Sequence, residues 1–263
     1  MSAYWEIAKK HFKMHWTYRS NFYMSIIGNA LYFFIMINVW QALYKTNELV
    51  NGITLTQMIT YTIITDLISS FAGSNIAYTI ASQVKDGTIG NELAKPIDYK
   101  MLHLAQFVGS NVLRTLCVTF PTVILMSIIY DLSIPSDLLT FGCFLFSAIL
   151  GMAIKYSIEF LFGILAFWLK TSEYSAFLLG ACGSLFSGNV VPLWFYPEIL
   201  RNIALVLPFR FMAFEPLAIY LGTYTLQEML SILTLQLLWF ITLILLERFL
   251  WQKVQKYLVI QGG

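Results

Sequence analysis

The chain has 263 residues, of which 58% are hydrophobic and only 11% are charged. A soluble globular domain carries roughly 25% charged residues, so this chain has too little polar surface to be covered by water alone. Its mean hydropathy of +0.70 agrees. The composition excludes an ordinary soluble domain and predicts an integral membrane protein, in which the positions of the charges matter more than the net charge of +2.

Residues 1–20 are predicted to form an amphipathic helix at the inner membrane surface. On a helical wheel one face is apolar and the other is basic, which suits a helix lying among anionic headgroups. The apolar face carries Trp5, Ala8, Phe12 and Trp16, and the polar face carries Glu6, Lys9, Lys10, Lys13 and Thr17. The helix serves either as a passive anchor or also as a contact for a cytoplasmic partner. No apolar h-region lies among these residues, so no cleavable signal peptide is expected.

Six apolar runs follow, each long enough for a helix to cross a bilayer, which takes about 17–25 residues. They cover about residues 22–44, 56–82, 102–130, 138–169, 174–192 and 229–246. We therefore expect an all-α membrane protein with six transmembrane helices, in which residues 1–263 form a single transmembrane domain.

The segment 187–222 is apolar but is not expected to form a seventh span. Four prolines divide it into pieces of a few turns, and four charges fall where a span needs apolar residues. The prolines are Pro192, Pro197, Pro208 and Pro216, and the charges are Glu198, Arg201, Arg210 and Glu215. Non-helical backbone at membrane depth must be covered by protein or water. We predict short external helices that lie at the interface or re-enter it.

Lysine and arginine in the short loops predict the orientation, because these residues concentrate on the cytoplasmic side. With both termini inside, the inner side holds Lys9, Lys10, Lys13, Arg19, Lys85, Lys95, Lys100, Lys170, Arg248, Lys253 and Lys256. The outer side then holds only Lys45, Arg201 and Arg210. The expected location is a cell membrane, crossed several times, with both termini cytoplasmic.

Four charged residues fall inside the predicted spans, namely Asp66, Arg114, Lys155 and Glu159. Such residues are costly in hydrocarbon and usually face protein or water. Lys155 and Glu159 are four residues apart, so they share one helix face and can pair as structural glue. Asp66 has no local partner, and it either contacts Arg114 or lines a substrate path.

Small residues punctuate several of these runs. In the fifth run Gly180 and Ser184 form a small-xxx-small pair, which permits close approach of helices. The pattern fits packing within the chain, or pairing with another subunit.

The loop between the second and third runs, Ser82 to Leu102, combines helix-breaking residues with apolar ones. Gly87 and Gly90 interrupt a helix, a short helix can start near Asn91, and Pro96 ends it. Apolar Val84, Ile89, Leu93 and Ile97 alternate with charged Lys85, Asp86, Lys95 and Asp98. The loop either presents a short helix to the groove of a partner or is a solvated connector.

The stretch Val84-Lys85-Asp86-Gly87-Thr88-Ile89, followed by Leu93-Ala94-Lys95-Pro96-Ile97, resembles the first cytoplasmic loop of bacterial ABC-2 type transporter permeases. The resemblance covers nearly the whole chain through the order of its parts: amphipathic N-terminus, six spans, this loop, and the broken segment before the last span.

The resemblance implies a permease subunit of an ATP-driven exporter. It places the coupling helix, which sits in a cleft of the ATPase, on residues 85–97, and external re-entrant helices on residues 187–222. The implied partners are two ABC ATPase subunits, a second identical or different permease subunit, and membrane lipid, with no nucleic acid. ATP and Mg²⁺ would be bound by the ATPase, with no cofactor in this chain.

No GxxxxGK[ST] motif is present, so ATP must be bound by another chain. The residues also offer no metal-ligand spacing, and we expect a transport subunit, not an enzyme. The apolar, aromatic-rich spans favour an amphipathic cargo such as a drug, a peptide or a lipid-like molecule. Two alternatives stay open. A self-sufficient secondary transporter would need broken helices and midplane acidic groups, and an intramembrane transferase would need paired carboxylates or histidines near the interface.

Overall fold

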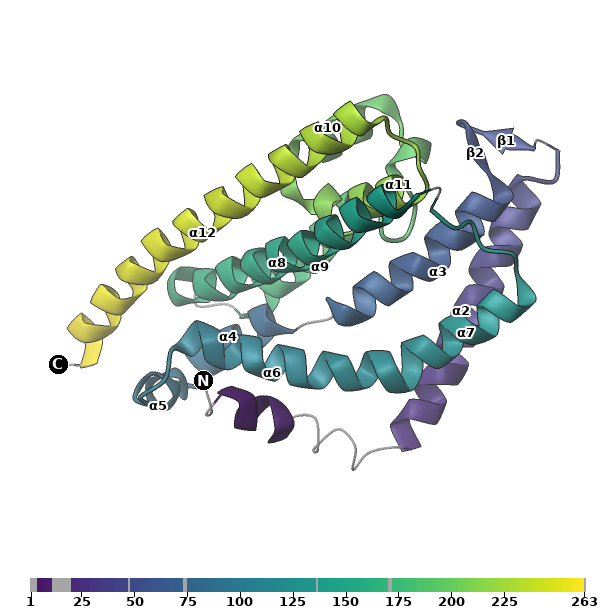
Figure 1. Ribbon diagram of the computed structural model, residues 1–263. Coiled ribbons are helices and arrows are strands. Elements are labelled where there is room, and N and C mark those ends of the chain that lie inside the picture. The colour runs from purple at the N-terminus through teal and green to yellow at the C-terminus, as the bar shows by residue number, and fades with distance from the viewer. Residues whose placement is uncertain are drawn as a thin grey trace.

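The computed structural model describes residues 4–10, 20–46, 48–72, 75–135, 137–169 and 172–262. This part of the chain is mostly helical, and its helices form an elongated bundle (Figure 1). A helix over residues 4–10, α5 (Ile89–Leu93) and the C-terminal end of α12 (Leu226–Gly262) lie at one end of the bundle. A β-hairpin and α10 (Glu198–Val206) lie at the other end.

Four helical stretches among the described residues are long and apolar enough to cross a membrane. They are Phe22–Leu43 within α2 (Ser20–Leu43), Tyr99–Ile129, Leu138–Trp168 within α8 (Leu138–Leu169), and Leu226–Gln255 within α12. The prediction of an all-α membrane protein is confirmed at this level. The last helix is longer than the expected run 229–246, because it continues through Glu247 and Arg248 without a break.

The second expected span, 56–82, is divided into α3 (Leu55–Phe71) and α4 (Ile76–Lys85). α3 begins with a capping box, in which the Thr54 hydroxyl accepts from the Gln57 N–H and the Gln57 side chain accepts from the Thr54 N–H. Because α3 and α4 are separate helices, the expectation of a single continuous helix over 56–82 was wrong. The sequence does contain a signal for this break, namely Gly73-Ser74-Asn75, because all three residue types favour turns over helix interiors.

The third expected span is one long helical path with a local change of winding. α6 (Tyr99–Arg114) begins where the Asp98 carboxylate accepts a hydrogen bond from the Met101 N–H. A π-helical turn, η1 (Thr115–Thr119), joins it to α7 (Phe120–Ile129). Pro121 has no N–H to donate to the preceding turn, and a local π-turn is one way in which a helix accommodates such a residue.

The fifth expected run, 174–192, forms the shorter helix α9 (Ser172–Phe186) of 15 residues. At about 1.5 Å per residue, it is shorter than the hydrocarbon layer of about 30 Å. The chain turns after it at Gly188, whose φ of +74° disfavours other residues. A Cβ atom at Gly188 would also lie 2.8 Å from Cβ of Phe214.

The segment 187–222 contains only short helices, none longer than the nine residues of α10. The others are η2 (Leu193–Phe195), η3 (Pro208–Met212) and α11 (Phe214–Tyr220). Pro192 and Pro197 immediately precede η2 and α10, and Pro208 begins η3. α10 is amphipathic and exposes Ile199, whereas every residue of η3 is buried and α11 is buried up to its last residue. This segment therefore builds part of the protein core next to α8.

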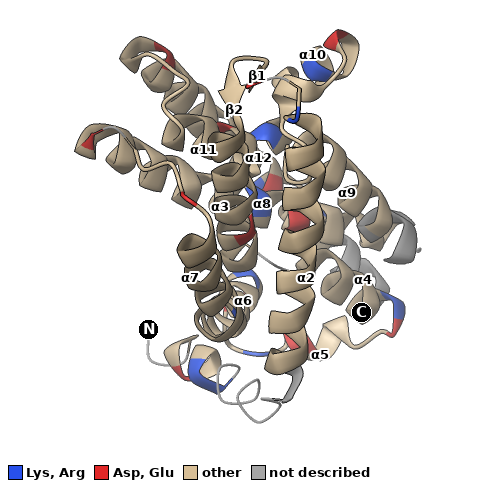
Figure 2. Cartoon of the chain, turned by 90° about the vertical axis from the view of Figure 1, so that its right-hand side faces the viewer, with Lys and Arg blue, Asp and Glu red and all other residues tan. Residues whose placement is uncertain are grey.

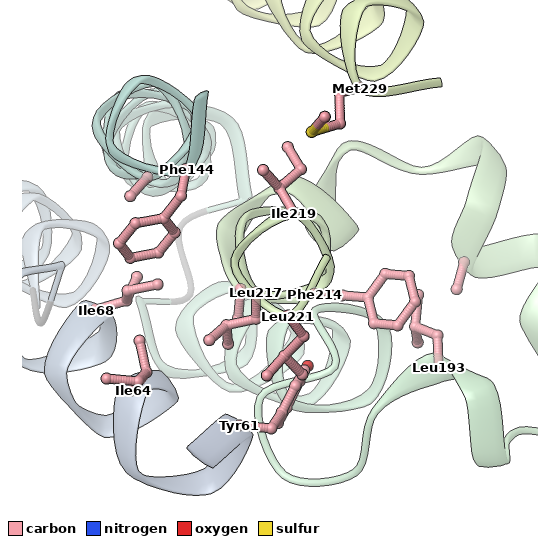
Figure 3. Close-up of a cluster of buried hydrophobic side chains, with 13 residues drawn as sticks. Tyr61, Ile64, Ile68, Phe144, Leu193, Phe214, Leu217, Ile219, Leu221 and Met229 are labelled. Carbon is pink, nitrogen blue, oxygen red and sulfur yellow. The ribbon is translucent and has the colours of Figure 1, made fainter. Parts of the chain in front are cut away.

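A cluster of buried side chains links this segment to α3 and α8 (Figure 3). Tyr61 from α3 lies beside Leu217, and its hydroxyl donates to the Gly188 carbonyl at 2.7 Å. The rings of Trp194 and Phe214 meet edge to face with centroids 4.8 Å apart. The Tyr61 hydroxyl thus supplies a hydrogen bond to the Gly188 carbonyl at the turn, and the Tyr61 ring fills apolar space.

One small β-hairpin departs from the all-α expectation. β1 (Leu49–Val50) pairs antiparallel with β2 (Ile53–Thr54) through a turn at Asn51 and Gly52, both with positive φ. Asn-Gly is the preferred pair for such a two-residue turn. The Asn51 side chain also donates to the Trp194 carbonyl at 2.8 Å, which ties the hairpin to η2.

Candidate functional site

The loop after α4 presents a polar surface at the end of the bundle. Lys85, Asp86, Gly87, Lys95 and Pro96 are exposed, while Ile97 is half-buried. α4 ends at Lys85, and Gly87 turns the chain with a φ of +71°. The five-residue helix α5 follows, held by an ion pair between Lys95 and Glu92. Within α5 the exposed residues are Gly90 and Asn91, and the exposed residues Ala94, Lys95 and Pro96 follow its end.

The apolar side chains of this loop face the protein. Ile89 is only 5% exposed and belongs to a core cluster with Tyr99, Phe160 and Val254. Val84 and Leu93 are partly buried against the same cluster. Ile89 and Leu93 therefore anchor α5 in the protein, and the polar residues of the loop face outward. A helical wheel cannot make this distinction in a five-residue helix, because neither face repeats.

Behind α5, four helices are joined through neighbouring residues of α6. The ring of Tyr99 stacks on Trp251 of α12, with centroids 5.4 Å apart and planes within 4°. Its hydroxyl donates to Gln83 of α4 at 2.6 Å. Lys100 forms an ion pair with Glu247 of α12, and the Lys100 carbonyl accepts from the Tyr156 hydroxyl of α8 at 2.6 Å. These contacts join α4, α6, α8 and α12 next to α5.

The helix over residues 4–10 rests on α6 near this loop. Ala8 is buried, and a Cβ atom at Gly109 would lie 2.3 Å from its carbonyl oxygen. The Tyr4 hydroxyl accepts from the Asp98 N–H at 3.0 Å. Trp5 is exposed, and Lys9 pairs with Glu6 at 3.0 Å. The remaining predicted members of this helix, Phe12, Lys13 and Trp16, lie outside the described residues.

Most charged residues lie near the two ends of the bundle, with a few inside it around α8 (Figure 2). Asp66 is partly buried and accepts a hydrogen bond from the Asn29 amide of α2 at 3.2 Å. Arg114 is near enough to attract the same carboxylate electrostatically. Asp66 thus joins α2 to α3, but it is not among the residues that line the cavity described below.

Lys155 and Glu159 lie near the middle of the 32-residue helix α8. The Lys155 ammonium is 3.9 Å from the nearer carboxylate oxygen of Glu159, so the predicted pair exists but is loose. The Glu159 carboxylate also accepts from the Ile76 N–H, the first residue of α4. On the other side of the helix break, the Asn111 amide donates to the Phe71 carbonyl at 3.1 Å. Side chains from α8 and α6 therefore satisfy backbone groups that the break frees.

A cavity of about 340 Å³ opens beside this break, between α4, α8 and α9. Lys155, Glu159, Asn75 and Asn189 contribute polar groups, with Ser69, Ser184 and Ser187. Leu179 and Met212 contribute apolar walls, and Gly180 and Gly183 leave space on α9. The sequence placed Lys155 and Glu159 on one helix face but did not connect them with α9 or with Asn75, which lies far away in the chain.

A second buried charge pair lies in the segment 187–222. Arg210 is 3.1 Å from Glu215, and the Tyr224 hydroxyl donates to the same carboxylate at 2.9 Å. Burial raises the pKa of Glu215, while Arg210 and the Tyr224 hydrogen bond act in the opposite direction. The sequence showed both charges but not the pairing, because a proline-rich segment has no fixed periodicity from which to infer it.

The model of the ABC-2 family transporter proteins matches residues 26–262, which is nearly the whole chain. No curated protein and no solved structure matches it. The family match agrees with the four apolar helices and with the order of the segments along the chain. The chain therefore belongs to the ABC-2 family of transporter proteins, and it is a multi-pass membrane subunit of a transporter.

Proposed function

We propose that this chain is the permease subunit of an ABC-2 exporter, driven by ATP that a separate pair of ATPase subunits hydrolyses. Two permease subunits, identical or different, would enclose the path of an amphipathic cargo. Family membership supports this proposal. So does the surface at α5, which combines an exposed tip with a buried connection to four helices.

The proposal includes six crossings with both termini in the cytoplasm. Besides the four long helices, α3 with α4 would make one crossing, and α9 would make another. The helix over 4–10 and the C-terminal end of α12 lie at the same end of the bundle, as an even number of crossings requires (Figure 1). That end carries Lys85, Lys95 and Lys100, which favours the cytoplasmic side. The segment 187–222 would then be external and partly re-entrant.

Coupling would act through the exposed tip of α5. The residues that face outward are Asn91, Lys95 and Pro96, with Gly87 at the preceding turn. Ile89 and Leu93 hold the other side of α5 in the cluster that includes Tyr99 and Trp251. A push on the exposed side is therefore delivered to packed side chains, which transmit displacement because protein interiors are close-packed.

The test is co-purification from native membranes of a tagged full chain, with identification of any P-loop ATPase that elutes with it. Asn91→Arg places a bulky charge on the exposed face of α5, and we expect loss of the ATPase without loss of the permease. Gln227→Arg is the matched control, because Gln227 is also exposed and lies at the opposite end of the bundle. Retention of the ATPase by Asn91→Arg would show that α5 is not the docking site.

One observation favours the alternative of a secondary transporter. The break between α3 and α4 beside Glu159 is a feature that such transporters use for midplane binding sites. Purified chain in sealed vesicles separates the two cases. Uptake driven by a proton or sodium gradient without any ATPase would support the alternative, and transport only with ATP and the ATPase would support the exporter.

A further inference from the structure

We propose that the cavity between α4, α8 and α9 binds a zwitterionic headgroup, the polar end of an amphipathic cargo. The inference rests on the proposed function for its role in transport. It names a site and a ligand class within a single permease chain. The site is built at the break between α3 and α4, where the bundle places charges of both signs next to empty space.

The cavity has the dimensions and lining of a ligand site. Its volume of about 340 Å³ lies within the roughly 300–1,000 Å³ of small-molecule pockets. Asn75, Ser184 and Asn189 supply neutral hydrogen-bonding groups around Lys155 and Glu159. Such a mixture of apolar walls and a few converging polar groups is typical of specific binding sites.

The charges inside the cavity select for a ligand that carries both signs. Lys155 and Glu159 both line it and lie 3.9 Å apart, which is too far for a hydrogen bond. An anion bound at Lys155 would lie against the Glu159 carboxylate, and a cation bound at Glu159 would lie against the Lys155 ammonium. Like charges at this range repel strongly where water is scarce. A zwitterion can instead place an opposite charge beside each of the two groups in a head-to-tail arrangement.

The helix break fixes one of these groups in place. The Glu159 carboxylate accepts from the Ile76 N–H at the start of α4, so the middle of α8 and the start of α4 are held together. The Lys155 side chain is 27% exposed and has the freedom of a long, flexible stem. Lys155 is thus the group that can move to meet the anionic part of a ligand.

The mouth of the cavity suits an apolar tail. Tyr78 of α4 and Gly180 of α9 both line the cavity and are exposed. Beside them on α9, Phe177 and Leu178 are exposed apolar residues. A headgroup held at Lys155 and Glu159 can therefore extend its chain between α4 and α9 toward this apolar surface.

The glycines of α9 allow the site to be closed without disturbing the fold. A Cβ atom at Gly183 would meet nothing within 4 Å, so Gly183→Leu extends into open space of the cavity. Gly142 of α8 is also without neighbours within 4 Å and does not line the cavity. Gly142→Leu is therefore a control with the same chemical change and the same gain of helix propensity.

The experiment measures binding to the full chain in nanodiscs without any ATPase. Three dodecyl amphiphiles serve as probes: dodecylphosphocholine, dodecyl phosphate and dodecyltrimethylammonium. We expect dodecylphosphocholine to bind at least roughly tenfold more tightly than either probe that carries charge of only one sign. Gly183→Leu should weaken its binding by roughly tenfold or more, whereas Gly142→Leu should leave it unchanged. Thermal unfolding of each variant checks that the fold is intact.

Charge variants give a readout that a purely structural role would not move. Lys155→Met should shift the preference toward dodecyltrimethylammonium, and Glu159→Gln should shift it toward dodecyl phosphate. Glu159→Gln keeps an oxygen that can accept from the Ile76 N–H, so α4 keeps its cap. Equal binding of the three probes, or unchanged binding by Gly183→Leu, would overturn the proposal. Because no ATPase is present, these results do not depend on whether α5 docks one.

Discussion

The side chains of Arg210 and Glu215 form an ion pair at 3.1 Å in which both are almost completely buried. The Tyr224 hydroxyl donates a hydrogen bond to the Glu215 carboxylate, and the centroid of the Phe211 ring lies 4.8 Å from the Arg210 guanidinium carbon. Within the described residues, the Arg210 Nε atom has no hydrogen-bond partner. The buried positive charge of the Arg210 guanidinium is therefore balanced by the Glu215 carboxylate.

Removal of the acid alone should destabilise the protein strongly. Glu215→Leu leaves a buried guanidinium without its counter-charge, which costs about 3–5 kcal/mol in comparable cases. The double variant Arg210→Met/Glu215→Leu should recover most of that loss, because no buried charge remains. Thermal unfolding in detergent of the wild type, both single variants and the double variant measures the cycle. Additive losses would mean that the two side chains do not compensate each other.

Burial of the Glu215 carboxyl also predicts a pH dependence of stability. Burial is the largest influence on the Glu215 carboxyl and raises its pKa above the ordinary 4.5. A carboxyl whose pKa is higher in the folded state contributes stability below its unfolded pKa, and this contribution is lost as the pH rises through the folded pKa. The unfolding midpoint of the wild type should therefore fall more steeply above pH 4.5 than that of Glu215→Gln. Parallel curves would contradict the prediction.

The glycines of α8 differ in the space around them. A Cβ atom at Gly151 would lie 2.2 Å from the Phe211 carbonyl oxygen, whereas one at Gly142 would meet nothing within 4 Å. Gly151→Ala should destabilise the protein by about 1–3 kcal/mol through overpacking. Gly142→Ala should be neutral or stabilising by up to about 1 kcal/mol, because alanine has the higher helix propensity. Unfolding temperatures of the two variants check this contrast, and equal values would refute the close packing of η3 on α8.

The stack of Tyr99 on Trp251 predicts a separation between ATPase binding and transport. Trp251→Leu removes an aromatic pair worth about 0.5–1.5 kcal/mol beyond its buried area, but leaves the exposed face of α5 unchanged. We expect the ATPase to co-purify as before, while ATP-driven transport in vesicles falls severalfold. Trp168→Leu, at an exposed site on α8, is the control. Normal transport by Trp251→Leu would exclude the stack from the coupling path.

Asp66 provides a test of the location of the cargo site. Its carboxylate bonds to Asn29, and it does not line the cavity. Asp66→Asn should therefore leave dodecylphosphocholine binding within about twofold of the wild type, although loss of the charge near Arg114 should lower the unfolding temperature. A loss of binding as large as that of Gly183→Leu would place Asp66 on the cargo path instead.

The sequence by itself determined the class of protein and most of its long helices. Apolar runs near 22–44, 102–130 and 138–169 can be read directly, because lipid requires both apolar side chains and internally bonded backbone. The prolines of the segment 187–222 excluded a seventh long helix for an equally local reason. The order of these parts was enough to indicate the family.

Only the tertiary structure decided where the second run breaks and which side of α5 is buried. Gly73-Ser74-Asn75 permits a helix or a turn, and the choice falls to Asn111 of α6 and Glu159 of α8, which satisfy the freed backbone groups. The side on which Ile89 is buried cannot be predicted from the sequence, because a five-residue helix has no repeating face, and it is set by packing against Tyr99 and Phe160. Contacts between residues far apart in the chain decide such features, and no local pattern contains them.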